Sequence, residues 1–451
     1  MQSSSSGGTA NWSSRSGFIL AAVGSSVGLG NLWRFSAEAG ANGGAAFIVV
    51  YLACVFFIGI PIIMSELLIG RAGKAASAIK SAEDLARRSK VSGAWSMGIW
   101  LGVISSFLIL SFYAVVAAWV LAYIPKFLNG AFNNQTPVQI AAQFDSLTTN
   151  PGELMPWYLL ICVLTIWLVA RGVNRGIEMA AKILMPSFFV LLLILAIVSV
   201  WTGWTTGGTQ LAVSFMFSPD ISKIDGNVAV SALGQAFFSL GIGMAMIATY
   251  GSYLPKNVNI PQSALIIGVC DTLVALIAGF AIFPIVFTFG LDFTAGAGLF
   301  FQTLPTALIN TSGGSWIGAA FFSMAFFAAL TTAVAFLEPA AAYVTEQFGL
   351  TKARSAIIIG IAVILFGLAS LYSLAFMDFL DTGLTAPILL PLSALLVVFF
   401  TGWRLDRRII AVQVGSQSPQ LAKFLFLMLR YVAPIMILVI MISGIYSQYF
   451  K

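Results

Sequence analysis

Residues 17–40 read GFILAAVGSSVGLGNLWRFSAEAG, an apolar stretch long enough to cross a membrane but interrupted in its middle by glycines. The glycines stand at Gly24, Gly28 and Gly30. Each glycine in a helix interior costs about 1 kcal/mol relative to alanine. The cluster therefore predicts that the helix unwinds at mid-depth, which is tolerated only where the freed backbone is buried in protein or faces a cavity.

The composition around this stretch is that of a membrane protein. Of 451 residues, 59% are hydrophobic and only 8% are charged, and the mean hydropathy is +0.97. A soluble domain carries about 25% charged residues, so a chain this apolar could not cover a soluble surface. With no histidine in the chain, Ser-His-Asp and Cys-His catalysis and nearly every zinc site are excluded. The three cysteines lie in apolar stretches and suggest buried hydrophobes rather than disulfides.

Eleven segments are apolar over the roughly 20 residues that a transmembrane helix needs. The predicted segments are 17–38, 45–70, 93–124, 156–172, 179–203, 228–253, 261–290, 314–345, 354–374, 377–402 and 428–449. Lysine and arginine concentrate in the loops of one face, which holds 18 of the 22 basic residues. By the positive-inside rule this face is cytoplasmic, so we expect a cytoplasmic N-terminus, an outer C-terminus and a place in the cell (inner) membrane. The net charge of +6 is then mostly an orientation signal, and no nucleic-acid partner is expected.

Residues 234–250, GQAFFSLGIGMAMIATY, repeat the glycine interruption in the sixth segment. The first and sixth segments each open a set of five, and an odd number of crossings forces the two sets into opposite orientation. The sequence thus predicts a five-plus-five inverted repeat with helices 1 and 6 unwound and one extra C-terminal helix. Paired breaks of this kind indicate a transporter site at the midplane, although small residues can also serve close helix packing.

The predicted organisation follows from these segments. We expect a flexible cytoplasmic N-terminus (1–11), a first repeat (12–203), an outer loop (204–227), a second repeat (228–402) with a re-entrant cap (292–313), and a linker with helix 11 (403–451).

Charges at membrane depth are functional candidates by default. Arg34 needs an anionic partner at membrane depth, and Asp381 is the best candidate because it lies at a similar depth. Glu66 is expected to accept hydrogen bonds from backbone N–H groups that the second break leaves free. Glu338 is either a packing polar group or a proton relay.

Five stretches carry a resemblance to a known family. GSSVGLGNLWRF (24–35), NGGAAF (42–47), GIPIIMSELLIGR (59–71), GQAFFSLGIGM (234–244) and LTTAVAFLEP (330–339) together resemble the neurotransmitter:sodium symporters, most closely their bacterial amino-acid branch. The resemblance implies the LeuT-like fold, no enzyme activity, and two sodium sites at the breaks. The first sodium would be held by the Ser26 carbonyl, Asn31, Ser239 and Asp271 with the substrate carboxylate. The second would be held by the carbonyls of Gly24, Val27 and Ala328 and the hydroxyls of Thr331 and Thr332. Oxygen ligands of these kinds suit a hard cation.

By the same resemblance, the substrate carboxylate would meet the N–H groups of Leu29 and Gly30 and the Tyr113 hydroxyl. Its amino group would meet the carbonyls of Ser26, Phe238 and Ser239. The side-chain pocket would consist of Ile109, Tyr113, Phe238, Gly241, Met244, Thr332 and Phe336. Phe238 resembles an aromatic lid, and Arg34 with Asp381 resembles an outer gate.

Three positions refine the expectation. Gly28 stands where monoamine carriers of the family have an aspartate, so we expect the ligand to bring its own carboxylate. Because the expected pocket is uncharged and has room at Gly241, it favours neutral, hydrophobic or aromatic α-amino acids. Asp271 stands where chloride-dependent members have a neutral residue, so we expect chloride independence and possible proton antiport, the alternative being a permanently ionised ligand. The inner gate would use Glu346 and Trp12, but Thr9 stands where the family has a basic residue. Inner closure is therefore either weakened, giving faster inward opening, or shifted to another partner.

Two other classes of protein fit less well. A channel usually builds its pore by oligomeric symmetry, whereas this chain has internal pseudo-symmetry. An intramembrane enzyme is remote because no nucleophile and base stand at a sensible spacing.

Overall fold

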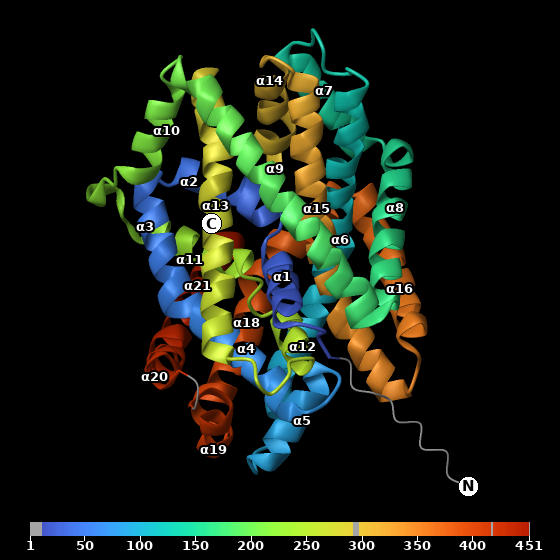
Figure 1. Cartoon of the computed structure of the whole chain (residues 1–451), viewed down its shortest axis with the longest axis vertical. Coiled ribbons are helices and arrows are strands. Elements are labelled where there is room, and N and C mark those ends of the chain that lie inside the picture. The colour runs from blue at the N-terminus through green and yellow to red at the C-terminus, as the bar shows by residue number, and fades with distance from the viewer. Residues whose placement is uncertain (1–10, 292–296, 416–417, 451) are drawn as a thin grey trace.

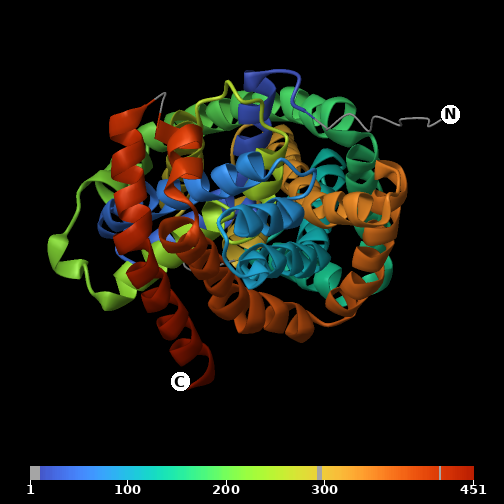
Figure 2. The same cartoon turned by 90° about the horizontal axis from the view of Figure 1, so that it is seen from below.

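The computed structural model describes residues 11–291, 297–415 and 418–450 of the chain. Within these ranges the chain forms helices and connecting loops without a strand, as the sequence predicts (Figure 1). The long helices pack side by side into one bundle, and the C-terminal helices lie at its periphery (Figure 2).

The described helices have the following bounds, with η marking 3-10 or π-helical turns. They are α1 (Arg15–Ser26), η1 (Gly30–Arg34), α2 (Phe35–Ala41), α3 (Ala45–Cys54), η2 (Val55–Gly59), α4 (Ile60–Gly73), α5 (Ala78–Arg88), η3 (Gly93–Ser96), α6 (Met97–Leu128), α7 (Pro137–Thr149), α8 (Pro151–Ala170), η4 (Val173–Glu178), α9 (Met179–Trp204), α10 (Gly208–Phe217), η5 (Ile221–Lys223), α11 (Gly226–Ser239), α12 (Met246–Ser252), α13 (Ile260–Thr288), η6 (Leu299–Thr303), α14 (Leu304–Ile309), α15 (Gly314–Phe348), α16 (Lys352–Tyr372), α17 (Leu374–Asp378), η7 (Phe379–Leu389), α18 (Leu390–Phe399), η8 (Phe400–Arg404), α19 (Arg407–Ile410), η9 (Ala411–Gly415), α20 (Pro419–Leu427), η10 (Met428–Val432) and α21 (Ala433–Tyr449).

Nine continuous spans among the described residues are long and apolar enough to cross a membrane. They match the second to fifth and the seventh to eleventh predicted segments, and only the last begins well before its predicted start, at Pro419. The first predicted segment is the bent pair of Arg15–Ser26 and Gly30–Ala41, whose two parts meet at 57°. The sixth is divided into α11 and α12, neither of which is long enough to count as a span of its own.

The short helices α7, α10 and α14 lie in the loops expected on the outer face. Part of the expected re-entrant cap, residues 292–296, lies outside the described residues. The remainder forms η6 and α14, where Phe300 and Phe301 are fully buried and their rings pack against Trp33 and Phe322. This segment is therefore part of the packed bundle.

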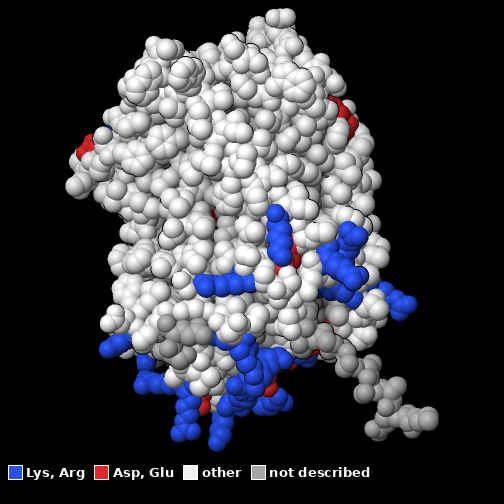
Figure 3. Space-filling model, in the orientation of Figure 1, with Lys and Arg blue, Asp and Glu red and all other residues white. Residues whose placement is uncertain are grey.

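Lysine and arginine gather at one end of the molecule, where α5 and α19 lie (Figures 1 and 3). The opposite half of the face in Figure 3 is almost free of charge. The bundle thus has the one-sided distribution of basic residues that the loop count predicts.

Two backbones touch in the half of the bundle nearest the basic end. A Cβ atom on Gly70 of α4 would lie 2.0 Å from the carbonyl oxygen of Ala248 in α12, and one on Gly251 would lie 2.9 Å from the Leu67 carbonyl oxygen. Real Cβ atoms do not approach so closely, so both positions require glycine. The inner half of the sixth segment is consequently seated directly on α4.

Candidate functional site

The two helix breaks lie side by side in the centre of the bundle. The chain leaves α1 after Ser26 and becomes helical again at Gly30, and it leaves α11 after Ser239 and becomes helical again at Met246. The Ser26 hydroxyl donates to the Leu240 carbonyl at 3.3 Å, which joins the two breaks directly. The glycine clusters predicted both interruptions at the observed positions.

The backbone of the second break adopts left-handed conformations that glycine permits. Gly241 and Gly243 have φ of +66° and +76°, and Ala245 follows at +55°. The Gly243 N–H donates to Glu66 Oε1 at 3.0 Å. This contact confirms that Glu66 accepts a backbone donor freed by the break, which would otherwise be a costly unpaired group.

A buried carboxylate connects both breaks to a neighbouring helix. Asp271 of α13 is fully buried and accepts hydrogen bonds from Asn31 Nδ2 at 2.8 Å and from the Ser239 hydroxyl at 2.6 Å. The Tyr51 hydroxyl donates to it from 3.4 Å. No lysine or arginine among the described residues lies within 4.0 Å of this carboxylate. Three of the four residues expected at the first sodium site therefore meet at one carboxylate, and Ser26 stands beside the same break.

The residues expected at the second sodium site also lie together, between α1 and α15. The Thr332 hydroxyl lies 3.3 Å from the Gly24 carbonyl oxygen and 3.4 Å from that of Val27. The Thr331 hydroxyl donates to the Ala328 carbonyl at 3.0 Å. A Cβ atom on Gly24 would lie 3.3 Å from Thr331 Cβ, so the second hydroxyl residue also lies against α1, and none of these oxygen groups carries a formal charge.

A cavity of about 1130 Å³ reaches the breaks and is lined at its other end by α7, which lies at the end of the molecule opposite α5 and α19 (Figure 1). Four of the expected substrate contacts line it: Leu29, Gly30, Tyr113 and Phe238. Its mouth is lined by Asp145 of α7 and by Tyr446 near the C-terminus. The Tyr113 hydroxyl is buried and has no hydrogen bond of standard geometry to a described residue.

The other expected pocket residues do not reach this cavity. They are Ser26, Ile109, Ser239, Gly241, Met244, Thr332 and Phe336. The expected room at Gly241 is occupied, because a Cβ atom there would lie 2.6 Å from Met246 Cε and 3.9 Å from Met244 Sδ. Sequence reasoning missed Met246, since only the conformation of the break turns its side chain toward Gly241.

The expected outer gate pair is not formed. Arg34 and Asp381 both line the cavity, but the ion pair of Arg34 is to Glu38, at 3.9 Å. The Arg34 guanidinium also lies 4.6 Å from the centre of the Phe238 ring. Glu38 stands four residues after Arg34 along the helix and is therefore nearer to it than Asp381, which lies across the open cavity. Arg34 and Asp381 thus face the same cavity without forming an ion pair in this conformation, and their role as an outer gate stays a prediction.

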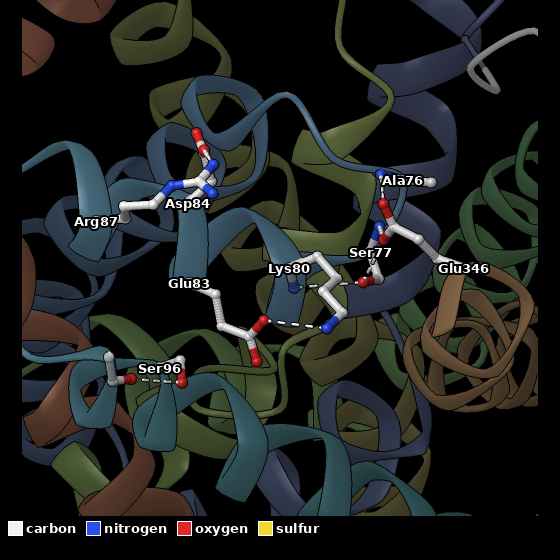
Figure 4. A network of polar contacts seen from close by, with 9 residues as sticks. Ala76, Ser77, Lys80, Glu83, Asp84, Arg87, Ser96 and Glu346 are labelled. Carbon is white, nitrogen blue, oxygen red and sulfur yellow. Dashed lines mark hydrogen bonds and ion pairs between the residues drawn. The ribbon is translucent and has the colours of Figure 1, made fainter. Parts of the chain in front are cut away.

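At the opposite end the structure is closed around Trp12. This side chain is 4% exposed, its ring packs edge-on against Tyr250, and its Nε1 donates to the Tyr250 carbonyl at 3.0 Å. Glu346 does not take part. It accepts from the N–H of Ala76 at 3.1 Å, and from the N–H and hydroxyl of Ser77 at 2.8 and 2.7 Å (Figure 4).

Glu346 thus holds the start of α5, where unpaired N–H groups attract a carboxylate. Its expected role as the inner gate acid stays a prediction. The expected flexible N-terminus lies largely outside the described residues, and so does Thr9.

Glu338 joins three elements near the same end. Its Oε1 accepts from the Tyr253 hydroxyl at 2.6 Å and pairs with Lys352 at 2.7 Å, while the side chain is fully buried. Its Oε2 has no hydrogen-bond partner among the described residues. The carboxylate is therefore an ion-paired cross-link rather than a simple packing group.

Comparison with known proteins decides the family. The sodium:neurotransmitter symporter family matches residues 9–140 and 132–450 of the chain. An uncharacterized sodium-dependent transporter of Bacillus subtilis is 32% identical over 96% of this chain and 97% of its own length. The chain belongs to the sodium:neurotransmitter symporter family. It is accordingly a sodium-dependent transporter of the membrane and not an enzyme.

The chain is also similar to a solved structure and to a human transporter. The crystal structure of MhsT in complex with L-phenylalanine superimposes with a TM-score of 0.87 at 38% identity, covering 97% of this chain and all of that one. The two proteins therefore share the LeuT fold. The human sodium- and chloride-dependent taurine transporter is 26% identical over 66% of this chain and 54% of its own.

Proposed function

We propose that this symporter imports neutral, hydrophobic or aromatic α-amino acids, driven by sodium and by alternating access of a central site. The observation that carries the proposal is the meeting of Asn31, Ser239 and Asp271 where the two broken helices adjoin. A buried carboxylate with neutral oxygen groups around it is a binding site for a hard monovalent cation.

The first sodium ion would bind at Asp271, together with Ser26, Asn31 and Ser239. The carboxylate supplies the compensating charge. Asn31 now directs its amide nitrogen to Asp271 and its oxygen to the Gly28 N–H, at 3.0 Å. To become a ligand it would turn the oxygen toward the ion.

The second sodium ion would bind among the carbonyls of Gly24, Val27 and Ala328 and the hydroxyls of Thr331 and Thr332. These groups already lie within 3.4 Å of one another in pairs. The site joins α1 to α15, so occupation would favour the arrangement in which these helices are packed together.

The substrate would place its carboxylate at the N–H groups of Leu29 and Gly30, with the Tyr113 hydroxyl as a further donor. A Cβ atom on Gly28 would lie 3.0 Å from the Thr332 hydroxyl and 3.4 Å from that of Tyr113. There is hence little space for an acidic side chain, and the carboxylate has to come from the ligand. The four expected substrate contacts that line the cavity, Leu29, Gly30, Tyr113 and Phe238, carry no formal charge, and the related MhsT was crystallised with L-phenylalanine.

Asp271 also underlies the proposal that transport is independent of chloride. A carboxylate at this place already balances the first sodium ion, so an anion is not needed. When sodium leaves, the buried charge is stabilised only by three neutral donors, which favours protonation and hence proton antiport.

The orientation proposed from the loops places the basic end in the cytoplasm and the C-terminus outside, in the cell (inner) membrane. The cavity mouth near Tyr446 then faces outward, and the closed end around Trp12 faces the cytoplasm. This conformation would be the one that receives sodium and substrate.

The direct test is uptake of labelled phenylalanine into proteoliposomes under a sodium gradient, with unlabelled amino acids as competitors. We expect sodium-dependent uptake that leucine, methionine, tyrosine and tryptophan inhibit and that lysine and glutamate do not. Replacing chloride by gluconate should leave the rate unchanged. Uptake that ignores the sodium gradient would refute the proposal, and loss of uptake in gluconate would refute chloride independence.

A further inference from the structure

A second buried carboxylate lies at the closed end of the molecule, on an element that the sodium and substrate sites do not use. Glu178 ends η4, at the start of the span that continues as α9, and its side chain is 1% exposed. It accepts hydrogen bonds from the Ser13 N–H at 2.8 Å, from the Ser13 hydroxyl, and from the Ser14 hydroxyl at 3.2 Å. All these donors belong to the segment that leads into α1.

A lysine completes the cluster from the same helix as the acid. Lys182 pairs with Glu178 at 2.7 Å and donates to the Ser13 hydroxyl at 3.2 Å, while 42% of its side chain remains exposed. The carboxylate thus interacts with four donors, three of them on the segment that leads into α1 and one, Lys182, on its own helix. Hydrogen bonds to a charged acceptor are about twice as strong as neutral ones.

The chain makes room for this contact at Gly17. A Cβ atom there would lie 2.0 Å from Glu178 Oε1 and 2.5 Å from its Cδ. Gly17 is inside α1, has no need of a left-handed conformation, and costs helix stability. Its absent side chain is therefore explained by the close approach of Glu178 to the helix.

The contact is more than an ordinary helix cap. The cap of α1 is Ser14, whose hydroxyl accepts from the Gly17 N–H at 3.0 Å. Glu178 adds a cross-link between α1 and α9 on one side of the segment, while Trp12 joins the other side to the Tyr250 carbonyl. Both contacts have to break before the inner half of α1 can swing away from the bundle.

From this arrangement we propose that Glu178, with Ser13, Ser14 and Gly17, is the cytoplasmic latch that keeps the inner half of α1 closed. It supplies the partner for inner closure in a chain whose N-terminal segment has no basic residue before Arg15. Of the two sequence-based alternatives, a weakened gate or a gate shifted to another partner, the structure favours the second. The inference rests on the proposed alternating access, for which Glu178 is a positioning residue and not a binding one.

The test measures cytoplasmic access to α1 with a cysteine reporter. Cys54, Cys162 and Cys270 are replaced by alanine, and Ala21→Cys, at a site 3% exposed, is labelled by a membrane-impermeant maleimide from the cytoplasmic side. In sodium without substrate, we expect Glu178→Gln and Gly17→Ala each to raise the labelling rate about tenfold. The sodium concentration needed for half-maximal protection should rise by a similar factor.

A double-mutant cycle separates the latch from general loosening. If Gly17→Ala acts by displacing the carboxylate, it should have little further effect in a Glu178→Ala background. Glu83→Gln, which removes a more exposed carboxylate from α5 at the same end, is the matched control and should label like the parent. Retained sodium-dependent phenylalanine binding shows that each variant is folded.

The outcomes are distinguishable from those of the proposed function. Slow labelling in both Glu178→Gln and Gly17→Ala, or additive effects in the cycle, would overturn the latch. If sodium changes neither labelling nor uptake in the parent while the variants still label faster, the latch stands and sodium-driven alternating access fails.

Discussion

Replacing Asp271 by asparagine would remove the one charge at the junction of the two broken helices while keeping the size of the side chain. Asp271 accepts from Asn31 at 2.8 Å and from Ser239 at 2.6 Å. An asparagine can turn its oxygen to one of these donors but not to both. The variant therefore separates the contribution of charge from that of packing.

The charge is expected to dominate the loss. A sodium ion about 4 Å from a carboxylate is stabilised by about 4 kcal/mol at the effective dielectric constant of about 20 that suits protein sites. The donor left without an acceptor adds about 1–3 kcal/mol, which local rearrangement reduces. Since about 1.4 kcal/mol is tenfold in affinity, the sodium concentration for half-maximal binding should rise roughly 1,000-fold or more.

The assay is equilibrium binding of labelled phenylalanine to purified protein against sodium concentration, in chloride and in gluconate. The parent should give the same curve in both salts. Asp271→Asn should bind weakly in gluconate and recover at least about tenfold in chloride, because a bound anion replaces the lost charge. Asp220→Asn, in an exposed loop, is the control.

Two results would refute this reasoning. If Asp271→Asn keeps the parental sodium dependence in gluconate, the carboxylate does not balance the ion. If binding is lost equally in both salts while the protein remains folded, the site cannot exchange a carboxylate for chloride, and the charge argument fails.

Three further predictions test other parts of the site. Thr331→Val removes one hydroxyl of the second sodium site and should weaken sodium activation about five- to tenfold, at roughly 1 kcal/mol per neutral oxygen ligand, without changing the order of competing amino acids. A changed order would place Thr331 in the substrate pocket instead. Met246→Ala should open space beside Gly241 and raise the preference for tryptophan over leucine severalfold in competition uptake; an unchanged ratio would mean that the substrate does not extend there. Glu346→Gln should lower the thermal midpoint through its weakened bonds to Ser77 but leave cytoplasmic labelling of α1 as in the parent. Faster labelling would restore Glu346 to the inner gate.

Local composition predicted most of the fold. The apolar segments and the charge asymmetry of their loops are visible in single stretches of sequence. The glycines at 241 and 243 locate the second break because glycine adopts such left-handed backbone angles more readily than other residues. Glu66 could be assigned for the same reason, since a break creates free N–H groups that need an acceptor. Asp271 and Asn31 were expected together only through the family resemblance.

The contacts that depend on conformation were not predictable in this way. Arg34 has carboxylates at Glu38 and Asp381 within reach in different states, and the sequence does not say which state is populated. Glu178 lies far in sequence from Ser13 and Gly17, and its role follows from the close approach at Gly17. Met246 is near Gly241 in sequence, but its side chain meets Gly241 only because of the left-handed bend at Ala245. The spacing of Glu178 and Lys182, four residues apart, predicts an ion pair within one helix but not the contact of Glu178 with the segment before α1.

The glycine seam between α4 and α12 restricts how the bundle can deform. With a backbone carbonyl at the place of each missing side chain, there is no layer of side chains to slide or change rotamer between the two helices. The two helices therefore cannot slide past each other at this seam, and α4 moves together with α12 as one rigid unit. Opening the end around Trp12 then displaces a unit of two helices, so the free energy of the transition is shared by every contact that α4 makes. Substitutions far from the ions, on the outer surface of α4, should consequently alter how fast the transporter turns over.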